Sequence, residues 1–198
     1  MSQTTTADAE NGTLHTNLWV SSLNEFKSLR VVIFCGMMCA FGVILNYVAT
    51  IRIGDFIKIG ISGIPNQVVA YLFGPAIAGI FGGVLDIIKF MLRPDGTFFP
   101  GFTISAILGG LIYGTVLYKK TVTVWRVLLA QFLVKLLVNI GCNTLWLNML
   151  YQKAILVILP ERILTNLIML PIDTIICYAV LKAADRSIRP LFRSGENG

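Results

Sequence analysis

The sequence predicts an all-α membrane protein, a compact bundle of six transmembrane helices. Hydrophobic residues make up 56% of the 198 positions and charged residues only 13%, whereas soluble domains contain about 45–50% and about 25% of these classes. Apolar segments near membrane-spanning length recur along the chain, and the polar positions inside them follow helical spacing. A chain of this composition is expected to fold in lipid as one membrane domain.

Six apolar segments, separated by charged or turn-forming residues, are expected to be the helices. Their expected ranges are 31–50, 60–73, 76–90, 103–118, 122–151 and 162–184. The second is shorter than the about 20 residues that a bilayer crossing requires, and Gly74-Pro75 separates it from the third by a tight turn. Pro160 precedes the sixth, where proline favours the first helical turn. The chain then divides into a polar N-terminal tail, the membrane domain and a C-terminal tail: 1–26, 27–186 and 187–198.

Basic residues are distributed unequally between the two sides of this bundle. The side that holds both termini carries nine: Lys27, Arg30, Lys119, Lys120, Arg126, Lys182, Arg186, Arg189 and Arg193. The other side carries five: Arg52, Lys58, Arg93, Lys153 and Arg162. Because cytoplasmic loops of membrane proteins are enriched in Lys and Arg, both termini are expected in the cytoplasm. The longer loops then face outward, and long loops favour a binding face.

The sequence lacks the signatures of several functional classes. It has no P-loop, no G-x-S-x-G elbow and no H-E-x-x-H motif, and its one histidine, His15, lies in the polar tail. The cysteines lack the spacing of a tetrahedral zinc site. The net charge of +6 is spread between hydrophobic segments instead of forming one basic face. We therefore expect no enzyme, no metal, no cofactor and no nucleic-acid partner.

Polar residues inside the expected helices form three stripes at helical spacing. They are Asp86, Lys89 and Arg93; Lys135, Asn139, Asn143 and Trp146; and Arg162, Asn166 and Asp173. Polar groups in a membrane are costly, so they are expected to pair or to face a cavity. For Asp86, Lys135 and Asp173, near mid-membrane, two interpretations stay open: a structural ion pair or a functional group.

The outward loop RPDGTFFPGF places three phenylalanines around a Pro-Gly. These rings would form an interfacial aromatic belt, pack beneath the loop, or stack on a flat ligand. Nearby carboxamides can hydrogen-bond a heteroaromatic edge, and outer arginines can either meet carboxylates or simply mark the membrane surface. The candidate ligand-binding residues are Arg93, Phe98, Phe99, Phe102, Asn143, Trp146, Arg162 and Asn166.

Small residues recur at four-residue spacing in three of the expected helices. They are Gly36 and Ala40 in the first, Gly79 and Gly83 in the third, and Ala106, Gly110 and Gly114 in the fourth. Such spacing allows helices to approach closely. Most of these contacts are expected inside the bundle, while Gly36 and Ala40 would also offer a flat surface to another membrane protein.

Three separated blocks of sequence resemble a known family. They are KIGISGIPNQVVAYLFGP (58–75), RPDGTFFPGFTISAILGGLIYG (93–114) and TLWLNMLYQKAILVILPERILTNLIMLP (144–171). Together they resemble the folate-type S components of energy-coupling factor (ECF) vitamin transporters. The resemblance runs from about residue 31 to residue 184, nearly the whole membrane domain.

The resemblance implies the S-component fold and a location in the bacterial cell membrane. It implies a subunit that captures folate on the outer face and delivers it through a transmembrane coupling subunit and two ATP-binding subunits, without an ATPase site of its own. Gly36 and Ala40 would contact the coupling subunit, although Gly36 departs from the family's Ala-x-x-x-Ala pattern. The alternatives are the same architecture binding riboflavin, thiamine or a pantothenate-like acid, a ligand-free scaffold, or a membrane enzyme acting on lipid or quinone.

Overall fold

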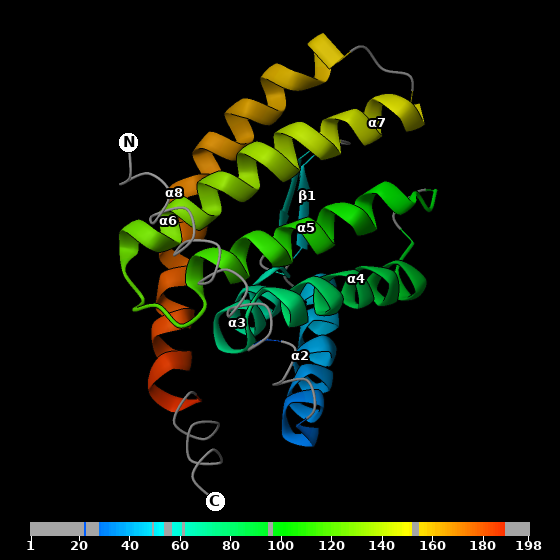
Figure 1. The fold of residues 1–198 in the computed structure, drawn as a ribbon. Coiled ribbons are helices and arrows are strands. Elements are labelled where there is room, and N and C mark those ends of the chain that lie inside the picture. Colours follow the sequence, from blue (N-terminus) through cyan, green and yellow to red (C-terminus); the bar gives the residue numbers. More distant parts are fainter. Residues whose placement is uncertain are drawn as a thin grey trace, which may run out of the picture.

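The computed structural model of the chain describes residues 22, 28–48, 50–53, 57–60, 62–94, 97–151 and 155–188. Its helices are α2 (Leu29–Val48), α3 (Ile64–Phe73), α4 (Pro75–Leu92), α5 (Pro100–Leu117), α6 (Val124–Leu133), η1 (Val134–Cys142), α7 (Asn143–Tyr151) and α8 (Ile155–Ser187). Since α6, η1 and α7 follow one another without a break, the described helices form six rods, as the sequence predicts (Figure 1). Most of the two predicted tails lies outside the described residues.

A short β-hairpin joins the first two helices, and the sequence analysis did not anticipate it. Strand β1 (Thr50–Ile53) pairs antiparallel with β2 (Ile57–Gly60), so that Thr50 lies opposite Gly60 and Ile53 opposite Ile57. Isoleucines alternate with Arg52 and Lys58 in these segments, and such two-residue periodicity is the usual signal of a strand. The predicted helical bundle is confirmed, with this hairpin added.

Five helices in the described part of the chain are long and apolar enough to cross a membrane. They are Leu29–Val48, Pro75–Leu92, Pro100–Leu117, Val124–Leu150 and Arg162–Ser187. Helix α3 has ten residues and extends only about 15 Å, half of a hydrocarbon core of about 30 Å. The six helices thus comprise five candidate spans and one short helix, which packs against α2, α4, α5 and α8.

Helix α8 differs from the prediction at its start. It begins at Ile155, upstream of the expected residue 162, and continues through both Pro160 and Pro171. Pro160 therefore lies inside the helix instead of at its entrance. Membrane helices tolerate an internal proline because neighbouring groups satisfy the carbonyls that it releases.

Helix α5 lies between α4 on one side and the long α6–η1–α7 helix on the other (Figure 1). A Cβ atom at Gly110 would lie 2.3 Å from the carbonyl oxygen of Ala78, and one at Gly114 would lie 2.3 Å from the Cα atom of Pro75. The backbones of α4 and α5 therefore touch where only glycine fits, as the small-residue spacing predicts.

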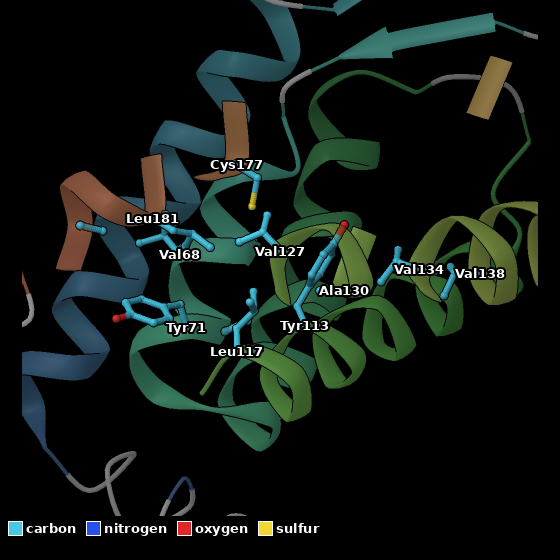
Figure 2. Close-up of a cluster of buried hydrophobic side chains, with 13 residues drawn as sticks. Val68, Tyr71, Tyr113, Leu117, Val127, Ala130, Val134, Val138, Cys177 and Leu181 are labelled. Atoms are coloured by element: carbon cyan, nitrogen blue, oxygen red, sulfur yellow. The ribbon is translucent and has the colours of Figure 1, made fainter. Parts of the chain in front are cut away.

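The apolar core lies where α3, α5, α6 and α8 meet. Val68, Val127, Cys177 and Leu181 converge there from three of these helices (Figure 2), and each is at most 4% exposed. The four cysteines are free thiols. This core fixes α8 against α3 and α6, and leaves a polar region between the same helices nearer to α7.

Ser22 caps the start of α4 from outside that helix. Its Oγ donates a hydrogen bond to the carbonyl oxygen of Phe73 at 2.6 Å and accepts one from the backbone N–H of Ile77 at 3.3 Å. The residue at the N-cap position, Gly74, has φ 88° and offers no side chain for this purpose. A buried serine from upstream thus satisfies a helix-terminal N–H group that would otherwise lack a partner.

Candidate functional site

A cavity of about 400 Å³ lies between α3, α4, α5, α6–η1 and α8. Its volume is within the range of small-molecule sites, about 300–1,000 Å³. Its polar lining residues are Asn66, Gln67, Asp86, Lys89, Ser105, Tyr113, Gln131, Lys135, Asn139, Asn143 and Asp173. Such a lining is unusual for the interior of a helical bundle and suits a ligand with several hydrogen-bonding groups.

Four carboxamides of the lining carry a buried atom without a hydrogen-bond partner among the described residues. The atoms are Asn66 Oδ1, Gln67 Oε1, Gln131 Nε2 and Asn143 Oδ1. Buried polar atoms are nearly always paired, because an unpaired one keeps its desolvation cost of about 1–3 kcal/mol. Residues on the cavity wall therefore retain hydrogen-bonding capacity, three acceptors and one donor, that the described residues do not satisfy.

Tyr113 connects two of these amides across the cavity wall. Gln67 Nε2 donates to the Tyr113 hydroxyl at 3.3 Å, and this hydroxyl donates to Gln131 Oε1 at 2.8 Å. Figure 2 shows Tyr113 among the side chains of the buried cluster. One phenol thus links α3, α5 and α6.

The polar pair that the sequence analysis left open is an ion pair on the cavity wall. Lys135 Nζ lies 2.6 Å from Asp173 Oδ2, so the structure contains an ion pair, one of the two interpretations left open, with Asp173 as the partner of Lys135. Asp86 instead accepts a hydrogen bond from Thr103 Oγ1 at 2.9 Å. All three charged residues line the cavity, so Lys135 and Asp173 combine an ion-pair contact with a position on the cavity wall.

The π-helix η1 sets which side chains of the long helix face the cavity. Val134 and Asn143 both line it, although nine residues span about two and a half turns of an α-helix and would place them on opposite faces. The i→i+5 hydrogen bonds of a π-helix widen each turn, so nine residues complete about two turns and bring both to one face. The four-residue spacing of Lys135, Asn139 and Asn143 fits this wider helix.

Three of the predicted aromatic residues form one cluster at the end of the cavity where helix α5 begins. The ring centroids of Phe99 and Phe102 are 6.1 Å apart, and those of Phe99 and Trp146 are 5.7 Å apart. Trp146 Nε1 donates to Ser105 Oγ at 3.0 Å. A Cβ atom at Gly101 would lie 2.5 Å from the ring of Phe99, so this glycine makes room for the cluster. Phe102 is the ring of the three that lines the cavity.

The predicted asparagines and Arg162 form a hydrogen-bonded chain beside this cluster. Asn143 Nδ2 donates to Asn139 Oδ1, and Asn139 Nδ2 donates to Asn166 Oδ1, each at 3.3 Å. Arg162 Nη1 donates to the Asn139 carbonyl at 2.8 Å, and Asn166 Nδ2 donates to the Arg162 carbonyl at 2.8 Å. Asn139 and Asn143 line the cavity, whereas Arg162 and Asn166 are outside the lining and contact it through Asn139.

Arg93 and Phe98 lie apart from the cavity lining. Arg93 donates to the Asn46 carbonyl at 3.3 Å and sits over the Tyr47 ring, 5.7 Å from its centroid. Phe98 packs on Phe90 with ring centroids 5.0 Å apart.

Gly36 and Ala40 are exposed on α2, and a Cβ atom at Gly36 would meet nothing within 4 Å.

Four cavity-lining residues are absent from the candidates predicted from the sequence: Asn66, Gln67, Tyr113 and Gln131. A signal was present for Gln131, which lies four residues before Lys135 and extends the stripe through Asn139 and Asn143. Asn66 and Gln67 are polar residues inside an apolar segment, which also marks a membrane site.

Among the described residues, no group of three or more His, Cys, Asp or Glu side chains is placed to hold a metal ion.

Comparisons with known proteins agree with this geometry. Residues 30–181 match the family model of the ECF transporter substrate-specific component. The chain is 39% identical over 160 residues to the folate transporter FolT of Clostridium novyi, covering 81% of this chain and 92% of that protein. It is 31% identical over 159 residues to FolT of Leuconostoc mesenteroides, covering 77% and 84%.

A solved structure has the same fold. The crystal structure of FolT bound with folic acid superposes with a TM-score of 0.73 at 33% identity, and the alignment covers 79% of this chain and 95% of that one. These matches confirm the resemblance seen in the sequence, and they describe a multi-pass membrane transport component instead of an enzyme. The chain belongs to the family of ECF transporter substrate-specific components.

Proposed function

We propose that this chain is the folate-binding subunit of an ECF-type importer. The observation that carries the proposal is the cavity itself: about 400 Å³, with an aromatic cluster at one end and unpartnered buried amides along its wall. A pterin is flat, has several donors and acceptors on its edge, and continues into an anionic glutamate. The similarity to FolT chains supports folate over riboflavin, thiamine or a pantothenate-like acid.

Each part of the ligand has a matching part of the site. Phe102 lines the cavity and would stack on the flat part of folate, with Phe99 and Trp146 packed behind it. Asn143 would read a polar edge through its unpartnered Oδ1, and Asn166 would hold the amide chain that orients it. Arg162, which lies outside the lining and donates to the Asn139 carbonyl, remains the sequence-based candidate for the glutamate carboxylates. Arg93 and Phe98 remain sequence-based candidates outside the lining.

Membership of the family supports a proposal for the partners and the location. Delivery of the vitamin would require a transmembrane coupling subunit and two ATP-binding subunits. The exposed small residues Gly36 and Ala40 on α2 are the proposed contact with the coupling subunit. The excess of Lys and Arg on the side of the termini supports a bacterial cell membrane protein with cytoplasmic termini.

The binding test is a titration of the detergent-solubilised protein with folate, riboflavin and thiamine, followed by tryptophan fluorescence. The dissociation constant for folate is expected to be below micromolar, with no response to the other two vitamins. Replacing Phe102→Leu should weaken folate binding about tenfold or more, because a stacking ring is lost. The matched control Phe98→Leu, in the same loop but outside the lining, should change it less than about threefold. No response to folate at micromolar concentration overturns the proposal.

The coupling test replaces Gly36→Trp on α2. Folate binding by the purified variant should persist, whereas uptake into cells that express the partner subunits should fall to background. The control Ile172→Trp places the same bulk on an exposed position of α8 and should leave uptake intact. Loss of both binding and uptake in Gly36→Trp would show that this position serves the bundle and not a partner.

A further inference from the structure

Asp86 lines the cavity, and no Lys or Arg among the described residues forms an ion pair with it. Lys135 pairs with the other cavity aspartate, Asp173. Lys89, three residues after Asp86 on α4, donates instead to the Ser62 carbonyl at 2.7 Å. An ionisable side chain inside a membrane domain is costly, so one that no cation of the fold neutralises is expected to serve a ligand.

The periodicity of α4 places Asp86 on the side of that helix that borders the cavity. Four residues of α4 line the cavity, at the i, i+3, i+4 and i+7 positions of one helical face: Gly82, Leu85, Asp86 and Lys89. Four large apolar residues are exposed and lie about 180° away around the helix: Ile80, Val84, Ile87 and Met91. Asp86 therefore projects from the cavity face of α4, opposite the face that is expected to meet lipid.

One oxygen of the Asp86 carboxylate is held, and the other is free to accept from a ligand. Oδ2 accepts a hydrogen bond from Thr103 Oγ1 at 2.9 Å. Oδ1 makes no hydrogen bond to the described residues, and it is not among the fully buried atoms that lack a partner. An ionised carboxylate accepts hydrogen bonds through both oxygens, each with two lone pairs, and donates none. Its hydrogen-bonding character is therefore the same whichever way the group is turned.

Two parallel N–H groups on a planar edge match a carboxylate, as the guanidinium of arginine does. A 2-amino-pyrimidin-4-one has this arrangement, with the ring N3–H beside the exocyclic 2-amino group, and the pterin of folate contains it. The glutamate end of folate carries carboxylates, which Asp86 would repel. The chemistry of Asp86 therefore suits the pterin end of the ligand and not the glutamate end.

We propose that Asp86 is a specificity-determining residue that accepts hydrogen bonds from the N3–H and 2-amino groups of the pterin. This inference rests on the proposed folate-binding function and adds a residue that the aromatic cluster and the asparagine chain do not include. Thr103 directly precedes none of these contacts but positions the carboxylate through its bond to Oδ2. Asp173 does not share the role, because Lys135 occupies its Oδ2.

The experiment measures the dissociation constants of folate and of 2-deaminofolate, in which hydrogen replaces the 2-amino group, for the full chain and for Asp86→Asn. The unaltered chain should bind folate at least about thirtyfold more tightly than the analogue, because the analogue lacks a hydrogen bond to a charged acceptor. In Asp86→Asn the side chain keeps its size but loses its charge and one acceptor, so this preference should fall to about threefold or less.

The matched control is Asp173→Asn, which removes the charge of the other cavity aspartate. It should change the dissociation constants of both ligands by the same factor and keep the preference for folate. If Asp86→Asn cannot be purified as a folded protein, Asp86→Ser also removes the carboxylate and should lose the preference in the same way.

The outcomes separate this inference from the proposed function. If the unaltered chain binds neither ligand, the proposed function fails and this inference falls with it. If it binds folate without preferring it to the analogue, or if the folded Asp86 variants keep the preference, the folate function stands and the role of Asp86 is refuted. A loss of affinity for both ligands at an unchanged ratio assigns Asp86 to the structure of the wall alone and also refutes the proposal.

Discussion

The two faces of helix α5 differ: one packs closely against α4, and the other borders the cavity. Toward α4, glycines let the backbones touch, and a Cβ atom at Gly110 would lie 2.3 Å from the Ala78 carbonyl oxygen. Toward η1, Ser105, Gly109 and Tyr113 border a cavity of about 400 Å³. The first face gains stability from close contact, and the second leaves space and buried polar atoms that the fold does not itself satisfy.

This difference shows where the bundle gives up stability for function. Glycine in a helix costs up to about 1 kcal/mol relative to alanine, and the α4–α5 contact offsets that cost by dispersion along the whole interface. The unpartnered amides of the cavity have no such compensation until a ligand supplies hydrogen bonds. Ligand binding is therefore expected to stabilise the protein mainly through the η1 side of α5.

The largest expected effect comes from adding bulk to the glycine face. Gly110→Val would force α4 and α5 apart, and we expect a loss of more than about 4 kcal/mol, enough to prevent purification of a folded protein. Gly109→Ala on the cavity face is the matched control, because its Cβ would meet only Val134 Cγ1, at 4.0 Å. The control should be as stable as the parent or gain about 0.5–1 kcal/mol. Thermal unfolding in detergent measures both, and equal tolerance at the two positions would contradict the contrast.

A smaller effect is expected from the ion pair on the cavity side. Asp173→Leu leaves Lys135 unpaired at 10% side-chain exposure, and we expect a loss of about 2–3 kcal/mol, below the ~3–5 of fully buried pairs because Asp173 is one-third exposed. The double variant Lys135→Met/Asp173→Leu should recover most of this loss. A thermal-unfolding cycle of the parent, the two single variants and the double variant gives the coupling. Additive losses would mean that the pair does not act as a unit.

The smallest expected effect comes from single hydroxyl groups of α5. Ser105→Ala removes the acceptor of Trp146 Nε1 and should cost about 1 kcal/mol and shift the tryptophan emission. Thr115→Val is the comparison, because Thr115 Oγ1 donates within its own helix, to the Ile112 carbonyl at 2.9 Å. It should cost less than about 0.5 kcal/mol and leave the emission unchanged. An emission shift in Thr115→Val but not in Ser105→Ala would reverse the assignment.

The aromatic loop shows how far sequence reasoning reached. The run RPDGTFFPGF predicted rings near a ligand, and the structure places Phe99, Phe102 and Trp146 in one cluster. The sequence could not distinguish these rings from Phe98, which packs on Phe90 instead. Adjacent residues in a loop can be of the same type and still point their side chains in different directions. The same reason applies to Arg93, which turns toward Asn46 and Tyr47.

The sequence by itself determined the membrane class, the six helices and the family, because hydropathy and residue spacing act locally or at short range. It left open whether Lys135 pairs with an aspartate, and the tertiary structure selects Asp173 over Asp86. Only the tertiary structure decided which polar residues share the cavity. Gln67, Tyr113 and Gln131 come from three helices, and the π-helical turn that brings Val134 and Asn143 to one face depends on hydrogen bonds that no spacing rule predicts. Whether a polar residue lines the cavity or is buried in the core therefore depends on how the helices pack. The packing determines which polar atoms are left without a hydrogen-bond partner.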